Sequence, residues 1–338
     1  MRALRYLPDA DPPVALVRDA PEPDAPTGSA RLKPRRAAVS SRDALALSPG
    51  SLYERIGKPV TLGSEFVADI VTASPATDAD KRRLELLEGK RVVADPSTAC
   101  SECDLCTRGL PQHCRHRRDL GAVGLDGALA DALALPIANL HPVPDKVDDD
   151  AAVFANAVAA AQHARAQLHL KGKTFVTVLG DSAEGLLCAQ LMARANASVR
   201  LVGEHPERLE ICAKWSVRHR PLADIGRHAD QDIVVDCTGT EAGLSTALTL
   251  VRPRGQVLLR APSALGSSAA ESLALIAERE LHVVGSRGGP INEALRALEN
   301  REVEVAALIS RRMKLDDAEN ALKLTANDPA TVKVMIDP

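Results

Sequence analysis

Four of the chain's seven cysteines lie within fifteen residues, in the stretch CSECDLCTRGLPQHC. Their spacing is C-x2-C-x2-C-x7-C, through Cys100, Cys103, Cys106 and Cys114. Four thiolates from one short loop can close a tetrahedron around zinc, and such a site leaves no open position for water or substrate. We therefore expect one zinc per chain, which folds the loop and takes no part in chemistry.

Two other uses of this cluster stay open. An iron–sulfur cluster also takes four cysteines, but the bacterial run places its last cysteine closer and follows it with proline. Unmetallated thiols are the second alternative. The N-terminus, MRALRYLPDADPPVALV, has no apolar run of signal-peptide length, so we expect a cytoplasmic chain in which disulfides are rare.

Composition argues against two classes of partner. The formal net charge of the 338 residues is −3 and no basic block dominates, so nothing points to nucleic acid or to an anionic membrane. The most apolar helical stretch, AAVFANAVAAAQHARAQLHL, carries polar and charged residues and is no membrane span.

Apolar runs divide the chain into two patterns. Up to about residue 150, short strands separated by proline and glycine predict a β-rich, barrel-like domain, with the cysteine lobe (about 95–118) as an irregular excursion. From 151 to 289, buried strands such as TFVTVLG, SVRLVG and DIVVDCTG alternate with helices, which predicts an α/β fold with a doubly wound parallel sheet. Residues 290–338 return to mixed helix and strand, and we expect them to pack on the first domain.

A glycine-rich turn, VLGDSAEG, follows the first of these buried strands and opens a helix. It matches the G-x-G-x-x-G fingerprint at Gly180 and Gly185, whereas Ser182 stands at the middle glycine. The turn predicts a pyrophosphate at the helix N-terminus, where the Ser182 hydroxyl can also bond phosphate. A sheet that binds no nucleotide is the alternative.

The tip of the next strand, in LVGEHPER, bears on the choice of nucleotide. An acidic residue at this tip binds the adenosine ribose. Here the tip is Gly203, which has no side chain, and Glu204 follows it. Glu204 would repel a 2′-phosphate, which favours NAD over NADP; alternatively, it merely caps the next helix.

Together these stretches resemble the zinc-type medium-chain dehydrogenase/reductase family, which includes alcohol, polyol and threonine dehydrogenases. GKRVVADPSTACSECDLCTRGLPQHC is similar to the family's structural zinc lobe, and VVDCTGTEAGLSTALTLVRPRGQVLLRA to its later Rossmann strands. The resemblance implies a GroES-like catalytic domain over 1–150, a Rossmann domain over 151–289, NAD or NADP as cofactor, and Thr238 and Gly239 beside the nicotinamide-side ribose. It also implies a small-molecule substrate, and a homodimer or homotetramer that pairs through GQVLLRA or LHVVGS.

The resemblance further implies a catalytic zinc, but each of its ligand motifs is altered in this chain. Ser40 in VSSRDAL stands where the family has cysteine, and Arg42 replaces the hydroxyl residue that starts its proton relay. Ser64 in LGSEFVADI replaces histidine, although Glu65 matches, and Asn156 in VFANAVAAA replaces glutamate. A protonated hydroxyl and a neutral amide are poor zinc ligands, so we expect the catalytic zinc to be lost.

Three functions are compatible with such a chain. The first is a zinc-independent, NAD(P)-dependent reductase of an activated carbonyl or conjugated double bond, with Ser40, Ser64 and Asn156 as hydrogen-bond donors in place of zinc. The second is a catalytically silent relative that serves as a binding or regulatory subunit. The third is an ordinary zinc alcohol dehydrogenase with a relocated metal site. His163, two helical turns after Asn156, is either a general acid or a surface histidine.

Overall fold

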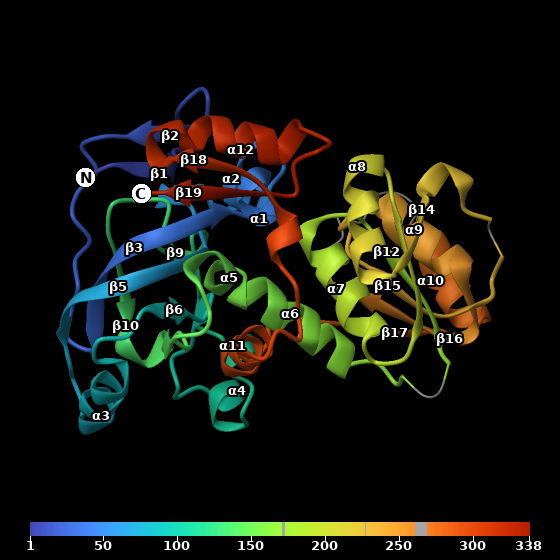
Figure 1. Ribbon diagram of the computed structural model, residues 1–338, viewed down its shortest axis with the longest axis horizontal. Coiled ribbons are helices and arrows are strands. Elements are labelled where there is room, and N and C mark those ends of the chain that lie inside the picture. The colour runs from blue at the N-terminus through green and yellow to red at the C-terminus, as the bar shows by residue number, and fades with distance from the viewer. Residues whose placement is uncertain (171–172, 227, 261–268) are drawn as a thin grey trace. The chain divides into compact units, whose positions relative to one another are not determined.

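The computed structural model describes residues 1–170, 173–226, 228–260 and 269–338, and it divides into two compact units (Figure 1). Unit 1 comprises Met1–Asn156 and Ile291–Pro338, and unit 2 comprises Ala157–Pro290. In the described part of the chain, no helix is long and apolar enough to cross a membrane.

Unit 1 is built on a seven-stranded sheet that joins both ends of the chain. Its path runs through β11 (Leu140–Pro142), β6 (Val92–Ala94), β5 (Glu65–Ser74), β3 (Ser29–Val39), β19 (Lys333–Asp337) and β18 (Ile309–Lys314), with β10 (Leu133–Pro136) paired to β3. The longest strand, β3, contains Pro34, which lies beside an irregularity in its register with β5, where a missing amide hydrogen is tolerated. Figure 1 shows the C-terminal strands, in red, beside the blue β3.

Smaller elements surround this sheet. A second sheet has the order β2 (Val14–Val17), β1 (Ala3–Tyr6), β4 (Val60–Thr61), and a third has the order β7 (Ser97–Thr98), β8 (Arg118–Leu120), β9 (Gly124–Leu125). The helices of unit 1 are α1 (Ser41–Ala44), α2 (Leu52–Ile56), α3 (Asp78–Leu87), α4 (Asp104–Thr107), α5 (Asp149–Val153), α11 (Ile291–Glu299) and α12 (Ala318–Asn327), and α6 (Ala155–Ala166) continues into unit 2.

The core of unit 1 is aliphatic, because the chain has so few aromatic residues. Three of its largest side chains, Tyr53, Phe66 and Phe154, are nevertheless fully buried. The remaining core residues are mostly alanine, valine, leucine and isoleucine, and they come from the strands and from helices such as α3 and α12.

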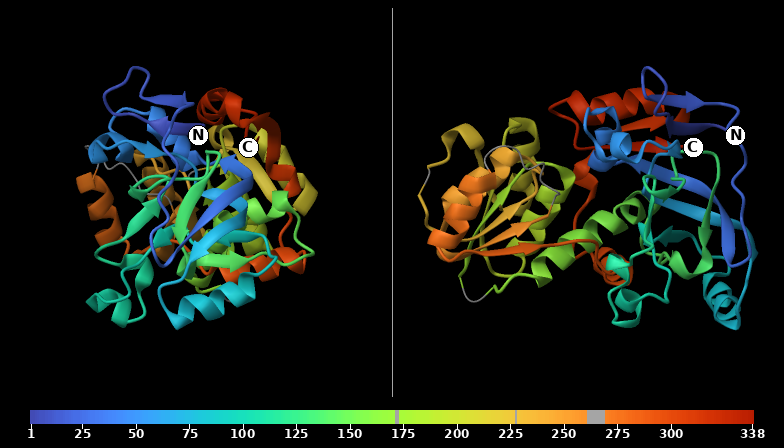
Figure 2. Two further views of the ribbon diagram at one scale, coloured as in Figure 1. Left: turned by 90° about the vertical axis from the view of Figure 1, so that its left-hand side faces the viewer. Right: turned by 180° about the vertical axis from the view of Figure 1, so that it is seen from behind.

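Unit 2 contains a six-stranded parallel sheet of the predicted doubly wound kind. Its order is β14 (Arg218–Pro221), β13 (Ser198–Gly203), β12 (Phe175–Leu179), β15 (Gln231–Asp236), β16 (Val251–Leu259) and β17 (His282–Gly285). Its helices are α7 (Ala183–Ala193), α8 (Pro206–Leu209), α9 (Glu241–Leu250) and α10 (Ala269–Glu278). Since β12 to β13 and β15 to β16 step outward in opposite directions, right-handed crossovers place α7 and α9 on opposite faces of the sheet, as Figure 2 shows.

The fold class predicted from the sequence is confirmed, and two details differ. The alternation of strands and helices predicts one helix over PERLEICAKW, but only Pro206–Leu209 is α-helical, and Glu210–Trp215 is a 3-10 helix. Isoleucine, cysteine and tryptophan have only modest helix propensity, which accounts for the tighter second half. Of the two strands expected to pair with a second copy, β17 lies at the sheet edge, whereas β16 lies inside the sheet.

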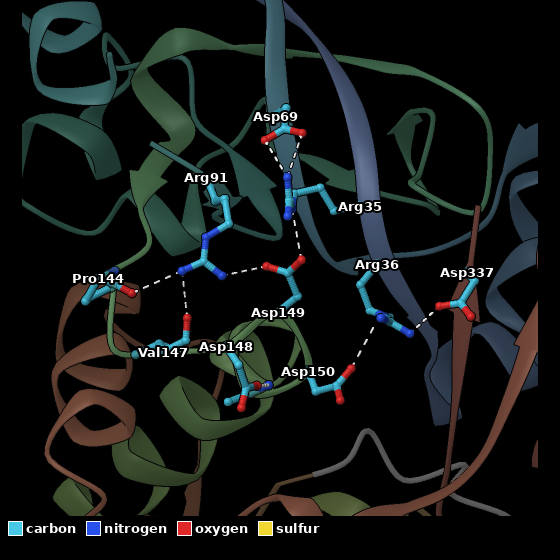
Figure 3. Close-up of polar contacts among 11 residues, drawn as sticks. Arg35, Arg36, Asp69, Arg91, Pro144, Val147, Asp148, Asp149, Asp150 and Asp337 are labelled. Carbon is cyan, nitrogen blue, oxygen red and sulfur yellow. Dashed lines mark hydrogen bonds and ion pairs between the residues drawn. The ribbon is translucent and has the colours of Figure 1, made fainter. Parts of the chain in front are cut away.

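Arginines from several strands hold the start of α5 in place (Figure 3). Asp149 accepts hydrogen bonds from Arg91 Nη1 at 2.5 Å and from Arg35 Nε at 2.9 Å. Arg91 also donates to the carbonyl oxygens of Val147, at 2.7 Å, and Pro144, at 3.3 Å. Burial alone would raise the pKa of Asp149, but the hydrogen bonds from the two arginines lower it overall.

The neighbouring carboxylate is held in the same way. Asp150 pairs with Arg36, at 3.3 Å between Nε and Oδ1, and with Arg312 of β18. Arg36 also pairs with Asp337 at the end of β19. The hydrogen bond from Arg312 is the main cause of the lowered pKa of Asp150. This network fixes the segment that leads, a few residues later, to Phe154 and Asn156.

We expect Arg91→Met to lower the free energy of unfolding by about 1–3 kcal/mol, because it leaves Asp149 with Arg35 as its one remaining arginine donor and removes the donor of two carbonyl groups. The lowered pKa of Asp149 sets the pH range of the effect. The ion-pair part is fully present above the unfolded-state pKa of aspartate, about 4, and is lost as the pH falls toward the lower folded-state value. Urea denaturation at pH 7 and pH 3 measures both.

Lys90→Met is the matched control, since Lys90 pairs with Asp145 and the two side chains are 42% and 82% exposed. Its effect should stay within about 0.5 kcal/mol. Equal effects of the two substitutions would contradict the anchoring role of Arg91.

Candidate functional site

The four cysteines of the lobe converge in the structure. Their Sγ atoms all lie within 4.8 Å of one another. Two of the Sγ–Sγ distances, Cys103–Cys106 and Cys114–Cys100, are 3.5 Å; Cys103–Cys114 is 3.9 Å and Cys100–Cys106 is 4.0 Å. Sulfurs at the usual 2.3 Å from a tetrahedral zinc would be about 3.8 Å apart. The donor set and its geometry therefore fit zinc.

Backbone amides prepare these sulfurs to act as thiolates. The amide of Cys103 donates to Cys100 Sγ at 3.4 Å, and the amides of Cys100 and His116 donate to Cys114 Sγ at 3.3 Å. Hydrogen bonds from backbone amides, chiefly that of Arg115, lower the pKa of Cys103 to about 6. Such outer hydrogen bonds orient metal ligands and tune their basicity.

The positions at which the sequence predicts altered zinc ligands gather where β3, β5 and β19 meet. Ala38 lies opposite Glu65 and Val39 lies opposite Val334, so the register brings the end of β3 against the start of β5 and β19. Asn156 Nδ2 donates to the carbonyl oxygen of Ser64 at 2.7 Å. We call Ser40, Ser64, Glu65, Asn156 and Lys333 the polar cluster.

A buried ion pair lies at the centre of the polar cluster. Lys333 Nζ is 2.5 Å from Glu65 Oε2, and their side chains are 3% and 9% exposed. The same ammonium lies 5.7 Å from the centroid of the Phe154 ring. Lys333 was missed in the sequence analysis, although a lysine inside the apolar run TVKVMID was the signal that could have found it.

Two of the three expected hydrogen-bond donors are already engaged within the protein. The Ser40 hydroxyl donates to Asp43 Oδ2 at 2.6 Å, and Ser40 forms the N-terminal capping box of α1 with Asp43. Asn156 uses its amide group on Ser64, and its Oδ1 is buried without a hydrogen-bond partner. Ser64 Oγ makes no hydrogen bond within the described part of the chain, so it is the hydroxyl free to reach a ligand.

Two side chains near the polar cluster have partners of their own. Arg42, at the position of the family's relay hydroxyl, donates to the carbonyl oxygen of Leu120. His163, proposed as a general acid, lies in α6, and its Nε2 is 3.4 Å from Gln167 Nε2.

Unit 2 places both fingerprint glycines where only glycine fits. Gly180 has a φ of +99°, in the left-handed region. A Cβ on Gly185 would lie 1.9 Å from the carbonyl oxygen of Gly180. Ser182 is the N-cap of α7, and its Oγ accepts the amide of Gly185 at 3.4 Å, so the hydroxyl lies at the helix N-terminus.

The other positions expected to bind the cofactor follow the carboxyl ends of β13 and β15. Gly203 ends β13, and the Glu204 side chain beyond it is exposed. Thr238 donates from its amide and hydroxyl to Asp236 Oδ1 at 2.9 and 2.6 Å, and Gly239 has a φ of +68°. Ligands of doubly wound sheets bind at this edge, so these residues occupy suitable positions for a nucleotide.

Comparison with known proteins defines the class. Residues 26–145 match the alcohol dehydrogenase GroES-like domain. The chain is 24% identical to a sorbitol dehydrogenase of Halalkalibacterium halodurans over 95% of each chain. The chain is therefore similar, over nearly its whole length, to zinc-type medium-chain dehydrogenases, which are oxidoreductases, and the resemblance read from the sequence is confirmed.

Two solved structures share its fold over nearly their whole length. A proposed zinc-binding dehydrogenase from Sinorhizobium meliloti, bound to NADP, has a TM-score of 0.85 and 23% identity, with 100% of this chain and 99% of that one covered. A short chain alcohol dehydrogenase from Escherichia coli CFT073, complexed with NADH, has a TM-score of 0.84, 21% identity and the same coverage.

We expect the purified protein to contain about one zinc per chain, because one donor set among the described residues fits zinc. Elemental analysis of desalted protein measures this number. Cys103→Ser should remove the zinc and lower the melting temperature, whereas Glu102→Gln, an exposed substitution in the same lobe, should do neither. A reproducible content of two zincs per chain would contradict the expectation.

Removing one partner of the buried ion pair should cost much more than removing both charges. Lys333→Met leaves the Glu65 carboxylate buried without its ammonium, and we expect a loss of about 3–5 kcal/mol in the free energy of unfolding. The double variant Glu65→Gln/Lys333→Met should recover most of that loss. Additive effects in a double-mutant cycle would show that the two side chains do not act as a pair.

Proposed function

We propose that this chain is an NAD(P)H-dependent reductase that transfers hydride without a catalytic zinc. The observation that carries the proposal is the combination of a nucleotide turn that keeps two of its three fingerprint glycines with a set of residues that are poor zinc ligands. Gly180 and Gly185 keep the backbone geometry of the fingerprint, while Ser40, Ser64 and Asn156 stand in place of zinc ligands. NADP and NADH in the two structural relatives support nicotinamide nucleotides as the cofactor class.

The donor chemistry of the polar cluster argues against zinc there. Glu65 is the sole carboxylate in the cluster, and its charge is neutralised by Lys333 at 2.5 Å. The Ser40 hydroxyl and the Asn156 amide group donate hydrogen bonds to other residues of the protein. Among the described residues, the four cysteines of the lobe are the one group of three or more metal-ligating side chains that converge, so a relocated zinc site finds no support.

These residues favour a particular kind of substrate. A bound reduced nicotinamide supplies a hydride. Without a Lewis acid, negative charge on the substrate oxygen must be met by hydrogen-bond donors and nearby cations. Ser64 Oγ is the free donor, and the Lys333 ammonium supplies a positive charge within the same cluster. Such groups stabilise charge less than zinc does, so the substrate should be electron-poor already: an activated carbonyl or a conjugated double bond.

A catalytically silent, binding function is the second candidate, and one observation favours it. Glu184 lies in the first turn of α7, where a pyrophosphate would bind, and a carboxylate there repels it. Arg260 Nη2 is 3.7 Å from Glu184 Oε1, and the Arg260 side chain is 13% exposed. This arginine offsets the charge of Glu184, which makes the reductase the better supported of the two.

The test is a turnover assay with NADH and NADPH against cyclohexenone, a benzoquinone and a simple ketone. We expect the enone or quinone to be reduced, with no effect of added zinc or of dipicolinate. Ser64→Ala should lower kcat by about a hundredfold, as the loss of a transition-state donor does. Ser41→Ala, an exposed neighbouring serine, should leave it unchanged.

Two results would contradict the proposal. Oxidation of a polyol that depends on added zinc would restore the ordinary metal mechanism. If neither nucleotide binds below millimolar concentration, the catalytically silent, binding function becomes the better supported one.

A further inference from the structure

The tip of β13 carries no side chain of its own, yet a carboxylate lies over it. Gly203 ends the strand, and a Cβ added there would lie 2.3 Å from Asp181 Oδ2 and 2.6 Å from Asp181 Cβ. The φ of Gly203 is not in the left-handed region, so its backbone does not require glycine. What requires glycine at 203 is the space that the Asp181 side chain fills.

Asp181 is held firmly in this place. It follows Gly180 in the nucleotide turn, and its side chain is 6% exposed. Its Oδ2 accepts the backbone amides of Glu204 and His205, both at 2.8 Å. Arg208 Nη1 lies 3.6 Å from Oδ1. The Asp181 carboxylate, which belongs to the nucleotide turn, therefore fixes the loop that follows β13.

The same carboxylate orients the ring of His205. Nδ1 lies 2.9 Å from Asp181 Oδ1 and 3.1 Å from Oδ2, and the His205 side chain is 31% exposed. A carboxylate accepts and cannot donate, so Nδ1 of the neutral ring carries the hydrogen and Nε2 is left as an acceptor. Nε2 has no hydrogen-bond partner within the described part of the chain.

We propose that Asp181 and His205 together form the adenosine-ribose subsite of the nucleotide, with the acidic group supplied by the turn instead of by the strand tip. This inference rests on the proposed nucleotide-dependent function. In sites of this fold, an acidic residue at the tip of the second strand accepts the ribose 2′-hydroxyl. Here His205 Nε2 accepts that hydroxyl, and Asp181 is a positioning residue that sets the tautomer and the place of the ring.

The subsite discriminates against a 2′-phosphate. A phosphate oxygen and His205 Nε2 are both acceptors, so they cannot form a hydrogen bond with each other. The negative charge of Asp181, on the other side of the ring, also repels the phosphate. The exposed Glu204 side chain, expected from the sequence to set this preference, is screened by solvent and contributes less. The subsite therefore selects NADH over NADPH through Asp181 and His205.

Asp181→Asn tests this with little change in shape. The amide oxygen keeps both backbone amides as donors, while the new NH2 group faces Nδ1 and moves the ring hydrogen to Nε2. Nε2 then donates to a phosphate. At pH 8, the ratio of the dissociation constants for NADPH and NADH should fall at least tenfold. Calorimetry with 5′-AMP and adenosine 2′,5′-bisphosphate should show the same shift, since both probes reach only the adenosine end.

The matched control is Glu204→Gln, which removes the exposed charge one residue from the tip and should change the ratio less than threefold. If Asp181→Asn folds poorly, variants that exchange the residues at positions 181 and 203 provide a second test. Gly203→Asp alone should abolish nucleotide binding, because its Cβ collides with Asp181. Asp181→Gly/Gly203→Asp moves the acid back to the strand tip and should restore NADH binding.

The possible results distinguish failure of the ribose subsite from failure of the proposed reductase function. Wild-type protein that binds neither nucleotide overturns the proposed function and the subsite with it. Wild-type protein that binds NADH, with a nucleotide ratio unchanged in Asp181→Asn or shifted tenfold by Glu204→Gln, overturns the subsite alone. A double variant no better than Gly203→Asp also overturns it.

Discussion

The ion pair between Lys333 and Glu65 is the interaction on which the rest of unit 1 depends. It joins residues 268 positions apart in the sequence and ties the last strand to the start of β5. Two charges buried this deeply are stable mainly as a pair, because each offsets the desolvation cost of the other. In the function proposed here, Glu65 therefore balances Lys333 and does not hold a metal.

The proposed nucleotide site in unit 2 also contains a charged side chain from another segment of the chain. Gly203 leaves the strand tip bare, and Asp181 fills the space from the neighbouring turn. In both units a charged side chain from another segment lies at an expected site position: Lys333 pairs with Glu65, and Asp181 lies over Gly203. The two side chains do different things: Lys333 neutralises an acid, whereas Asp181 brings one in.

The sequence could predict those features that local spacing determines. The cysteine lobe was predictable because its four ligands lie in one short loop, and the strand SVRLVG was predicted with the bounds that the structure gives it. The roles of Ser40, Lys333 and Asp181 were not predictable in this way. Each depends on a partner brought close by the fold: Asp43 in the capping box of α1, Glu65 across the sheet, and the backbone beyond Gly203. Patterns of hydrophobicity do not contain such contacts.

In the function proposed here, hydride transfer needs no metal in the polar cluster. Anomalous diffraction at the zinc absorption edge, from crystals grown with NADH and excess zinc, tests that claim most directly. We expect one anomalous peak per chain, among Cys100, Cys103, Cys106 and Cys114, with none beside Ser40, Ser64 and Asn156. A second peak within bonding distance of Glu65 would show that the cluster still holds zinc, and it would contradict the account.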